Sequence, residues 1–448
     1  MKTKILLWIV VLILGFAAAL ALLNPPLQTV TLADGTKLTL EKVACGKRPD
    51  LKGWSGNFYE NDNTNGTLNI WLQRQYPPGK HAAADYHFVL VGESGYSASE
   101  PTWNMFHSAG SNQSSRNFFL NIIYQIWNRF HPARKNQDTE FISFDSFPRR
   151  DANLTLQIRQ WPDSPTAEEF TEEVTNRDYW KKTVKGEFHF SNPARGPFQN
   201  WQPLPLPATA RDGDLEITLT KLVFGISEHR GGELHPSDPD DRAVSAAFLI
   251  KQNGRVATNW LPVHIDEWDA TGNHAANNEW ESRLQGNEAV MQYQWGLPSG
   301  EPAWKLRAEF SRTSGFSDDE LLAFTNVPIV TDKVYLVDQI PGITDAFAKK
   351  NFAGTVVYVF SVRKSEDPDD NGKEQLRFEV NPPLEGLGLK LLKVTDERGG
   401  EVGQFLKSWG VSTYNYELKN PGDAKMVNVT LALHKSRFVE FTVKPEKQ

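Results

Sequence analysis

Residues 29–43, TVTLADGTKLTLEKV, carry the clearest fold signal in this 448-residue chain. Apolar and polar residues alternate on both sides of Asp34-Gly35, as they do along a strand that buries one face. An Asp-Gly pair accepts the positive φ angles of a tight turn. The stretch therefore predicts a β-hairpin.

A second version of this stretch occurs later in the chain. Residues 38–46 (LTLEKVACG) align with residues 217–225 (ITLTKLVFG), and each segment follows an Asp-Gly pair. Two more pairs of segments match in the same order, 154–159 with 304–309 and 190–193 with 324–328. Three matches in one order predict that a unit of the chain is duplicated.

The predicted units are β-sandwiches. We place them at 27–208, 209–329 and 330–448, and the first two are the related pair. Short alternating segments with turn residues every eight to twelve positions or so predict a mainly β protein of tandem antiparallel β-sandwiches, immunoglobulin-like or fibronectin-like. A single cysteine excludes the Cys–Trp–Cys core of true immunoglobulin domains, so this prediction concerns architecture and not family.

Two further hairpins are predicted from pairs of alternating segments. In the second unit, Val244–Lys251 is followed by a turn at Asn253-Gly254 and a return strand over Arg255–His264. At the end of the chain, Met426–His434 and Arg437–Val443 form the final predicted pair.

The N-terminal segment, residues 1–26, predicts a membrane anchor. Two lysines precede an uncharged run from Ile5 through Trp8 to Leu23, which as a helix is roughly 28 Å long and so matches a bilayer. Lysines before the span place the bulk of the chain outside the cytoplasm. A cleaved signal peptide, cut after Ala19-Leu20-Ala21, is the alternative and gives a secreted or periplasmic protein. A buried soluble helix is a third interpretation.

The first unit contains an insertion over about 47–140. Within it, apolar residues recur at Phe118, Ile122, Ile126 and Phe130, which is the spacing of one helix face. We expect one short amphipathic helix here. It either packs on a sheet or docks a partner or the membrane surface.

Charge and motifs exclude several classes of function. The chain has 48 Lys and Arg against 55 Asp and Glu, a net charge of −7, and no long basic block, which speaks against nucleic-acid binding. One cysteine excludes an internal disulfide framework and a cysteine-rich zinc site. The sequence has no Gly-x-Ser-x-Gly, His-Glu-x-x-His or P-loop motif, so the chain reads as non-enzymatic and no cofactor is expected apart from a possible divalent metal.

The candidate metal ligands are His264, Asp266, Asp269 and His274 in the second unit. Imidazoles and carboxylates at this density can bind a divalent ion. In a strand, His264 and Asp266 share one face. A solvated loop at the end of a sandwich is the simpler interpretation.

Tryptophans provide a second kind of candidate site. The chain has 14 of them, and sugars stack on exposed aromatic rings. Strand-like contexts assign Trp71, Trp260 and Trp304 to the core. Polar, loop-like contexts make four others candidate ligand-binding residues: Trp54, Trp103, Trp268 and Trp280.

Together these features predict an exported, membrane-anchored, non-catalytic interaction or structural protein of the cell envelope. Its expected partners are the membrane, through the N-terminal helix, and an envelope protein or polysaccharide. One alternative is a saccharide-binding module that uses the loop tryptophans. A second alternative is a metal-dependent hydrolase centred on the loops of the second unit.

Overall fold

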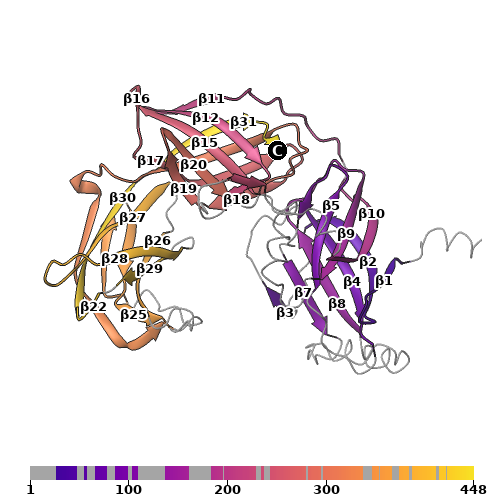
Figure 1. Ribbon diagram of the computed structural model, residues 1–448, viewed down its shortest axis with the longest axis horizontal. Coiled ribbons are helices and arrows are strands. Elements are labelled where there is room, and N and C mark those ends of the chain that lie inside the picture. Colours follow the sequence, from indigo (N-terminus) through magenta and orange to yellow (C-terminus); the bar gives the residue numbers. More distant parts are fainter. Residues whose placement is uncertain are drawn as a thin grey trace, which may run out of the picture.

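The computed structural model describes residues 27–47, 55–57, 66–77, 86–98, 103–108, 137–160, 183–194, 196–228, 234–236, 243–278, 281–293, 296–335, 346–352, 354–365, 373–382, 386–409, 413–419 and 421–447. These residues form a mainly β protein with several antiparallel sheets, as the sequence predicts (Figure 1). Three groups of buried apolar side chains organise the sheets, and we call them the first, second and third cores. In Figure 1 the sheets of the second core lie at the top. The sheets of the first core lie below them on the right, and those of the third core on the left.

The first core lies between a six-stranded sheet, in the order β1-β2-β4-β8-β7-β3, and a four-stranded sheet, β10-β9-β5-β6. The predicted hairpin at Asp34-Gly35 is confirmed, because β1 and β2 pair antiparallel around Gly35 at φ +86°. The strands are β1 Thr29–Thr31, β2 Lys37–Gly46, β3 Ser55–Asn57, β4 Thr67–Gln75, β5 Tyr86–Gly92, β6 Ser97–Ala98, β7 Trp103–Ser108, β8 Gln137–Phe144, β9 Asn153–Gln160 and β10 Val184–Ser191.

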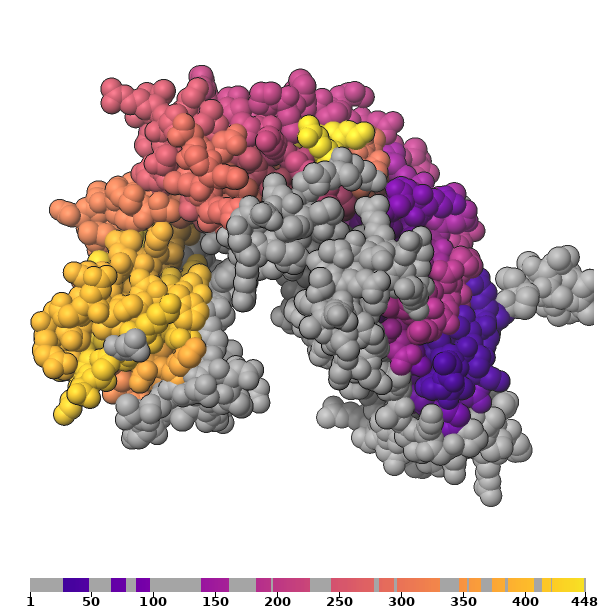
Figure 2. All heavy atoms as spheres, in the orientation of Figure 1, coloured from indigo at the N-terminus to yellow at the C-terminus, as the bar shows by residue number. Residues whose placement is uncertain are grey.

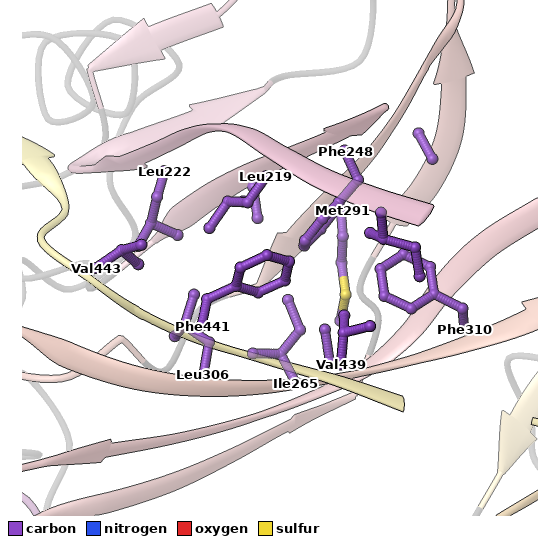
Figure 3. Close-up of a cluster of buried hydrophobic side chains, with 14 of the residues drawn as sticks. Leu219, Leu222, Phe248, Ile265, Met291, Leu306, Phe310, Val439, Phe441 and Val443 are labelled. Carbon is purple, nitrogen blue, oxygen red and sulfur yellow. The ribbon is translucent and has the colours of Figure 1, made fainter. Parts of the chain in front are cut away.

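The second core lies between β11-β12-β15-β20-β19 and the four-stranded sheet β18-β17-β21-β31. Side chains from both sheets point toward each other in Figure 3, including Phe248 and Met291 from one sheet and Ile265, Leu306 and Phe441 from the other. The strands are β11 Ala208–Asp212, β12 Leu215–Phe224, β13 Ile226–Glu228, β14 Leu234–Pro236, β15 Val244–Gln252, β16 Arg255–Val256, β17 Trp260–Asp269, β18 His274–Asn278, β19 Glu281–Gln285, β20 Glu288–Tyr293, β21 Trp304–Arg312, β31 Arg437–Val443 and β32 Glu446–Lys447.

The third core is enclosed by the remaining strands, in the order β23-β24-β26-β25-β22-β30-β27, with β29 paired to β26 and β28 to β29. A 3-10 turn, η2, leads into β22. The elements are η2 Asp318–Glu320, β22 Leu321–Tyr335, β23 Ala348–Phe352, β24 Thr355–Val359, β25 Val362–Ser365, β26 Glu374–Asn381, β27 Leu387–Asp396, β28 Gly403–Trp409, β29 Thr413–Lys419 and β30 Met426–Lys435.

The predicted final hairpin is wrong. β30 pairs with β22 and β27 around the third core, whereas β31 pairs with β21 of the second core. The cause is burial, because Val439, Phe441 and Val443 of β31 all belong to the second core. The chain therefore crosses from the third core back to the second at Ser436.

The predicted hairpin at Asn253-Gly254 is correct only at its turn. β15 pairs with the two residues of β16, and the chain then enters β17 in the facing sheet. Trp260 and Ile265 of β17 are buried in the second core, which a return strand beside β15 would not allow.

The aligned stretches of the first two units occupy equivalent places. β2 and β12 are each second in their sheet, and each carries an irregularity at the aligned position, between Leu40 and Lys42 and between Leu219 and Lys221. β27 of the third unit also has a register irregularity, between Leu391 and Lys393. These correspondences support a duplication. The relationship and the unit boundaries stay predictions, as does the immunoglobulin-like assignment.

Two sequence predictions fall outside the described residues: the membrane span from Ile5 through Trp8 to Leu23, and the amphipathic helix over 118–130. Within the described part of the chain, no helix is long and apolar enough to cross a membrane.

Candidate functional site

Four of the predicted site residues lie on the outer face of the sheet β18-β17-β21-β31. After the bulge between Pro262 and His264, side chains alternate along β17, so Ile265 points into the second core while His264, Asp266 and Trp268 point away from it. This brings His264, Asp266 and Trp268 to one face, and β18 adds His274 opposite Trp268. We call this surface the β17 face.

Asp266 is held between two histidines. Its Oδ1 lies 3.2 Å from Nε2 of His264 and 3.4 Å from Nε2 of His274. Burial raises the pKa of Asp266, but hydrogen bonds and positive charge from the two imidazoles outweigh burial and hold that pKa well below its usual value. The carboxylate is therefore charged at any physiological pH.

The ring of Trp268 stacks on that of His274, with ring centroids 5.0 Å apart and planes 17° apart. Trp268 is half-buried. Stacking on a neighbouring strand fixes the orientation of both rings. An aromatic surface and a charged carboxylate thus lie side by side on the β17 face.

Charged residues of β21 and β31 continue this face. Lys305 lies opposite Trp268 and forms an ion pair of 2.9 Å with Glu440. Arg307 lies opposite Asp266, and its guanidinium carbon is 4.6 Å from the centre of the Phe438 ring. Sequence reasoning missed these residues, because nothing local links β31 to β21.

The third core approaches one end of the β17 face. Glu309 lies opposite His264 in the sheet, and burial raises its pKa. Burial and the charge of Glu309 raise the pKa of Tyr414, on β29, to about 12. Glu309 and Tyr414 therefore lie near each other where the second and third cores meet. At the other end, the Lys305 and Glu440 side chains are about half exposed, at 41% and 55%.

Asp269 does not join the other candidate metal ligands. Its carboxylate points away from the β17 face and closes the β17–β18 turn, where Oδ1 accepts hydrogen bonds from the backbone and hydroxyl of Thr271 and from the backbone of Asn273. An odd spacing from Asp266 along a strand sets the two carboxylates on opposite faces. Among the described residues, no group of three or more His, Cys, Asp or Glu side chains has a geometry suited to a metal ion.

Of the other candidate tryptophans, the structure describes the backbone of one. Trp103 is the first residue of β7 and pairs with Ser143 of β8, in the first core's sheet. Trp54 and Trp280 lie outside the described residues. As expected, Trp260 and Trp304 are buried in the second core.

The turn after β17 is bound to the first core. Asn273 donates from Nδ2 to the carbonyl of Phe147 at 2.9 Å and accepts the Phe147 N–H on Oδ1 at 3.3 Å. Arg149 donates to the carbonyls of Thr271 and Gly66 at 2.9 and 2.8 Å. We call these contacts the first junction. They hold the strand pair that carries the β17 face in a fixed position.

Comparisons with known proteins do not identify the chain. No protein-family model matches it, and no curated protein matches it. Among solved structures, the crystal structure of the conserved domain protein from Bacillus anthracis covers 66% of this chain and 81% of that chain, with 8% sequence identity and a TM-score of 0.19. A likeness of this size carries no argument.

Proposed function

We propose that this chain is an exported, membrane-anchored, non-catalytic interaction protein of the cell envelope, and that the β17 face is its binding surface. The observation that carries the proposal is the combination of a half-buried Trp268 with paired charges on one sheet face. Aromatic side chains supply contact area, and charged pairs at the margin select a partner.

The mutual pairing of these side chains favours recognition over turnover. The Asp266 carboxylate accepts from both histidines, and Lys305 is bound to Glu440. A surface whose rotamers are fixed by its own contacts loses little entropy when it binds. The hydrogen bonds of the first junction also fix the β17–β18 turn, which carries one end of this surface.

A photocrosslinking pair tests the binding surface. A photoreactive residue at Lys305, in the full-length chain in intact cells, should give one dominant envelope adduct. The matched control is Lys251 of β15, which is also ion-paired to a glutamate and similarly exposed, but lies on the opposite sheet. Equal adducts from both positions, or none from Lys305, would refute the proposal.

The membrane anchor has its own test. The full-length chain should sediment with membranes, and deletion of 1–26 should release at least nine-tenths of it into the soluble fraction. A mature protein whose measured mass lacks residues 1–21 would instead support the cleaved signal peptide.

Saccharide binding is the second candidate, because Trp268 lies beside a charged carboxylate and two imidazoles. A sugar ring can stack on the indole while its hydroxyls donate to Asp266. Trp268→Ala should weaken co-sedimentation with envelope polysaccharide at least tenfold, about 1.4 kcal/mol. The control is Trp71→Ala, another half-buried tryptophan, on β4. Equal weakening by both variants would exclude Trp268 as the contact.

A further inference from the structure

We propose that the junction between the second and third cores is an acid-sensitive hinge, which a neutral His434 holds closed and a protonated His434 opens. His434 lies on β30 of the third core and is fully buried. It contacts Ser311 and Arg312, which end β21 of the second core. We call these contacts the second junction.

The protonation state of His434 follows from its hydrogen bonds. The backbone N–H of Arg312 donates to Nε2 of His434 at 2.8 Å, and the Ser311 hydroxyl lies 3.0 Å from the same nitrogen. A backbone N–H can only donate, so Nε2 carries no proton. The ring proton is therefore on Nδ1, which has no hydrogen-bond partner within the described part of the chain.

The second junction is tightly packed around the imidazole. The rings of Trp260 and Phe316 lie with their centroids 6.4 and 5.1 Å from that of His434. A Cβ atom at Gly388 would lie 2.7 Å from Cε1 of His434 and 2.4 Å from the Ser311 hydroxyl oxygen. Only glycine fits there, so β27 approaches this close because it has no side chain at that position.

The charges around His434 oppose protonation. Arg312 faces it from β21, Lys390 from β27 and Glu320 from η2. Burial is the largest cause that lowers the pKa of His434, the charges of Arg312 and Lys390 add to it, and the charge of Glu320 opposes it. The result is a pKa of about 4. Glu320 itself is ion-paired with Arg312.

A proton on Nε2 removes the acceptor of the Arg312 N–H and sets two donors against each other. It also adds a positive charge beside Arg312 and Lys390. In an open junction, the imidazole titrates at its ordinary pKa of 6.5. The closed junction binds fewer protons than the open one between these two pKa values. Its stability is therefore complete above pH 6.5 and falls as the pH drops from 6.5 toward 4.

An open hinge stays tethered. The chain crosses between the two cores twice, between β21 and β22 and between β30 and β31. Opening would also move Tyr414 away from Glu309.

The test measures the distance between the two cores. Dyes on V256C of β16 and D423C, at exposed positions of the second and third units, report it by energy transfer in a full-length C45S background. Acidification from pH 7.5 to 4.5 should reversibly reduce the transfer efficiency of the parent by at least a third, while far-UV circular dichroism stays constant.

The deciding variant is His434→Gln, because a glutamine amide can place an acceptor where Nε2 lies and does not titrate. It should keep the transfer efficiency of pH 7.5 over the whole range. The control, His189→Gln, alters a side chain that is 67% exposed and should open like the parent. Opening of the glutamine variant at the parent's pH, or constant transfer in the parent, would overturn the proposal.

Hydrogen exchange of the parent provides a measurement that needs no variant at His434. The Arg312 amide donates to His434 and should lose protection at least tenfold between pH 6.5 and 4.5, after correction for intrinsic rates. Amides in the centre of β21 should keep theirs. Unchanged protection of Arg312 would also overturn the hinge.

Discussion

A chain that ends after Ser436 should lose the second core and keep the third. The deleted residues include β31, although they follow directly on β30 of the third core. β31 is the strand that pairs with β21 along its length, from Trp304↔Val443 to Phe310↔Arg437. Its removal takes three buried side chains out of the second core and leaves β21, still paired with β17, as the edge strand of its sheet.

The expected loss is large. Val439, Phe441 and Val443 are at most 3% exposed. Full burial of such a side chain contributes about 1.5–3 kcal/mol, so the three together contribute roughly 5–9 kcal/mol. A whole domain is stable by only about 5–15 kcal/mol. The truncated second core should therefore be largely unfolded at 25 °C.

Hydrogen exchange with mass spectrometry separates the two cores. Peptides from β21 (Trp304–Arg312) should lose protection, and peptides from β27 and β30 should keep it. The control chain ends after Val443, which removes only 444–448 with the short β32 and should exchange like the full-length protein. Loss of protection in β30 with an intact β21 would show that the C-terminal strand belongs to the third core.

The destination of β31 illustrates what local sequence can and cannot predict. Alternation predicts that 437–443 is a strand with one buried face, and it is. The same alternation fits a hairpin with β30 or a strand beside β21 equally well. Which sheet accepts the strand depends on the space left in the second core, and that is set by residues far away in the sequence. By contrast, Asp34-Gly35 fixes its hairpin locally, through the positive φ angle of Gly35.

The candidate site also combines residues placed by local sequence spacing with residues placed by strand pairing. His264 and Asp266 share a face because they are two apart in one strand, so the sequence predicts their proximity. His274 joins them through the register of β18, and Lys305 and Glu440 through β21 and β31. The Asp269 carboxylate lies apart from them in the β17–β18 turn, and Asp269 followed by Thr271, Gly272 and Asn273 is itself a turn pattern that predicts such local hydrogen bonds.

Asn273→Ala should uncouple the first core from the second. The Asn273 side chain is fully buried and bonds both backbone groups of Phe147, and its Nδ2 also donates to Asp269 Oδ2 at 2.7 Å. Alanine leaves the Phe147 N–H and C=O without these partners. A buried polar group that loses its partner costs about 1–3 kcal/mol, so the two Phe147 groups together should cost the variant about 2–6 kcal/mol.

Urea unfolding followed by tryptophan emission measures this loss. The parent should unfold its first two cores together, because the first junction couples them, whereas the variant should show an earlier, separate transition. The control is Asn259→Ala, which removes one exposed hydrogen bond of 3.3 Å to Ser314 and should change stability by less than about 0.5 kcal/mol. Equal midpoints for the two variants would mean that Asn273 does not couple the two cores. The hydrogen bond from Arg149 to the Thr271 carbonyl and the 2.9 Å ion pair between Arg150 and Glu301 would then hold them together without it.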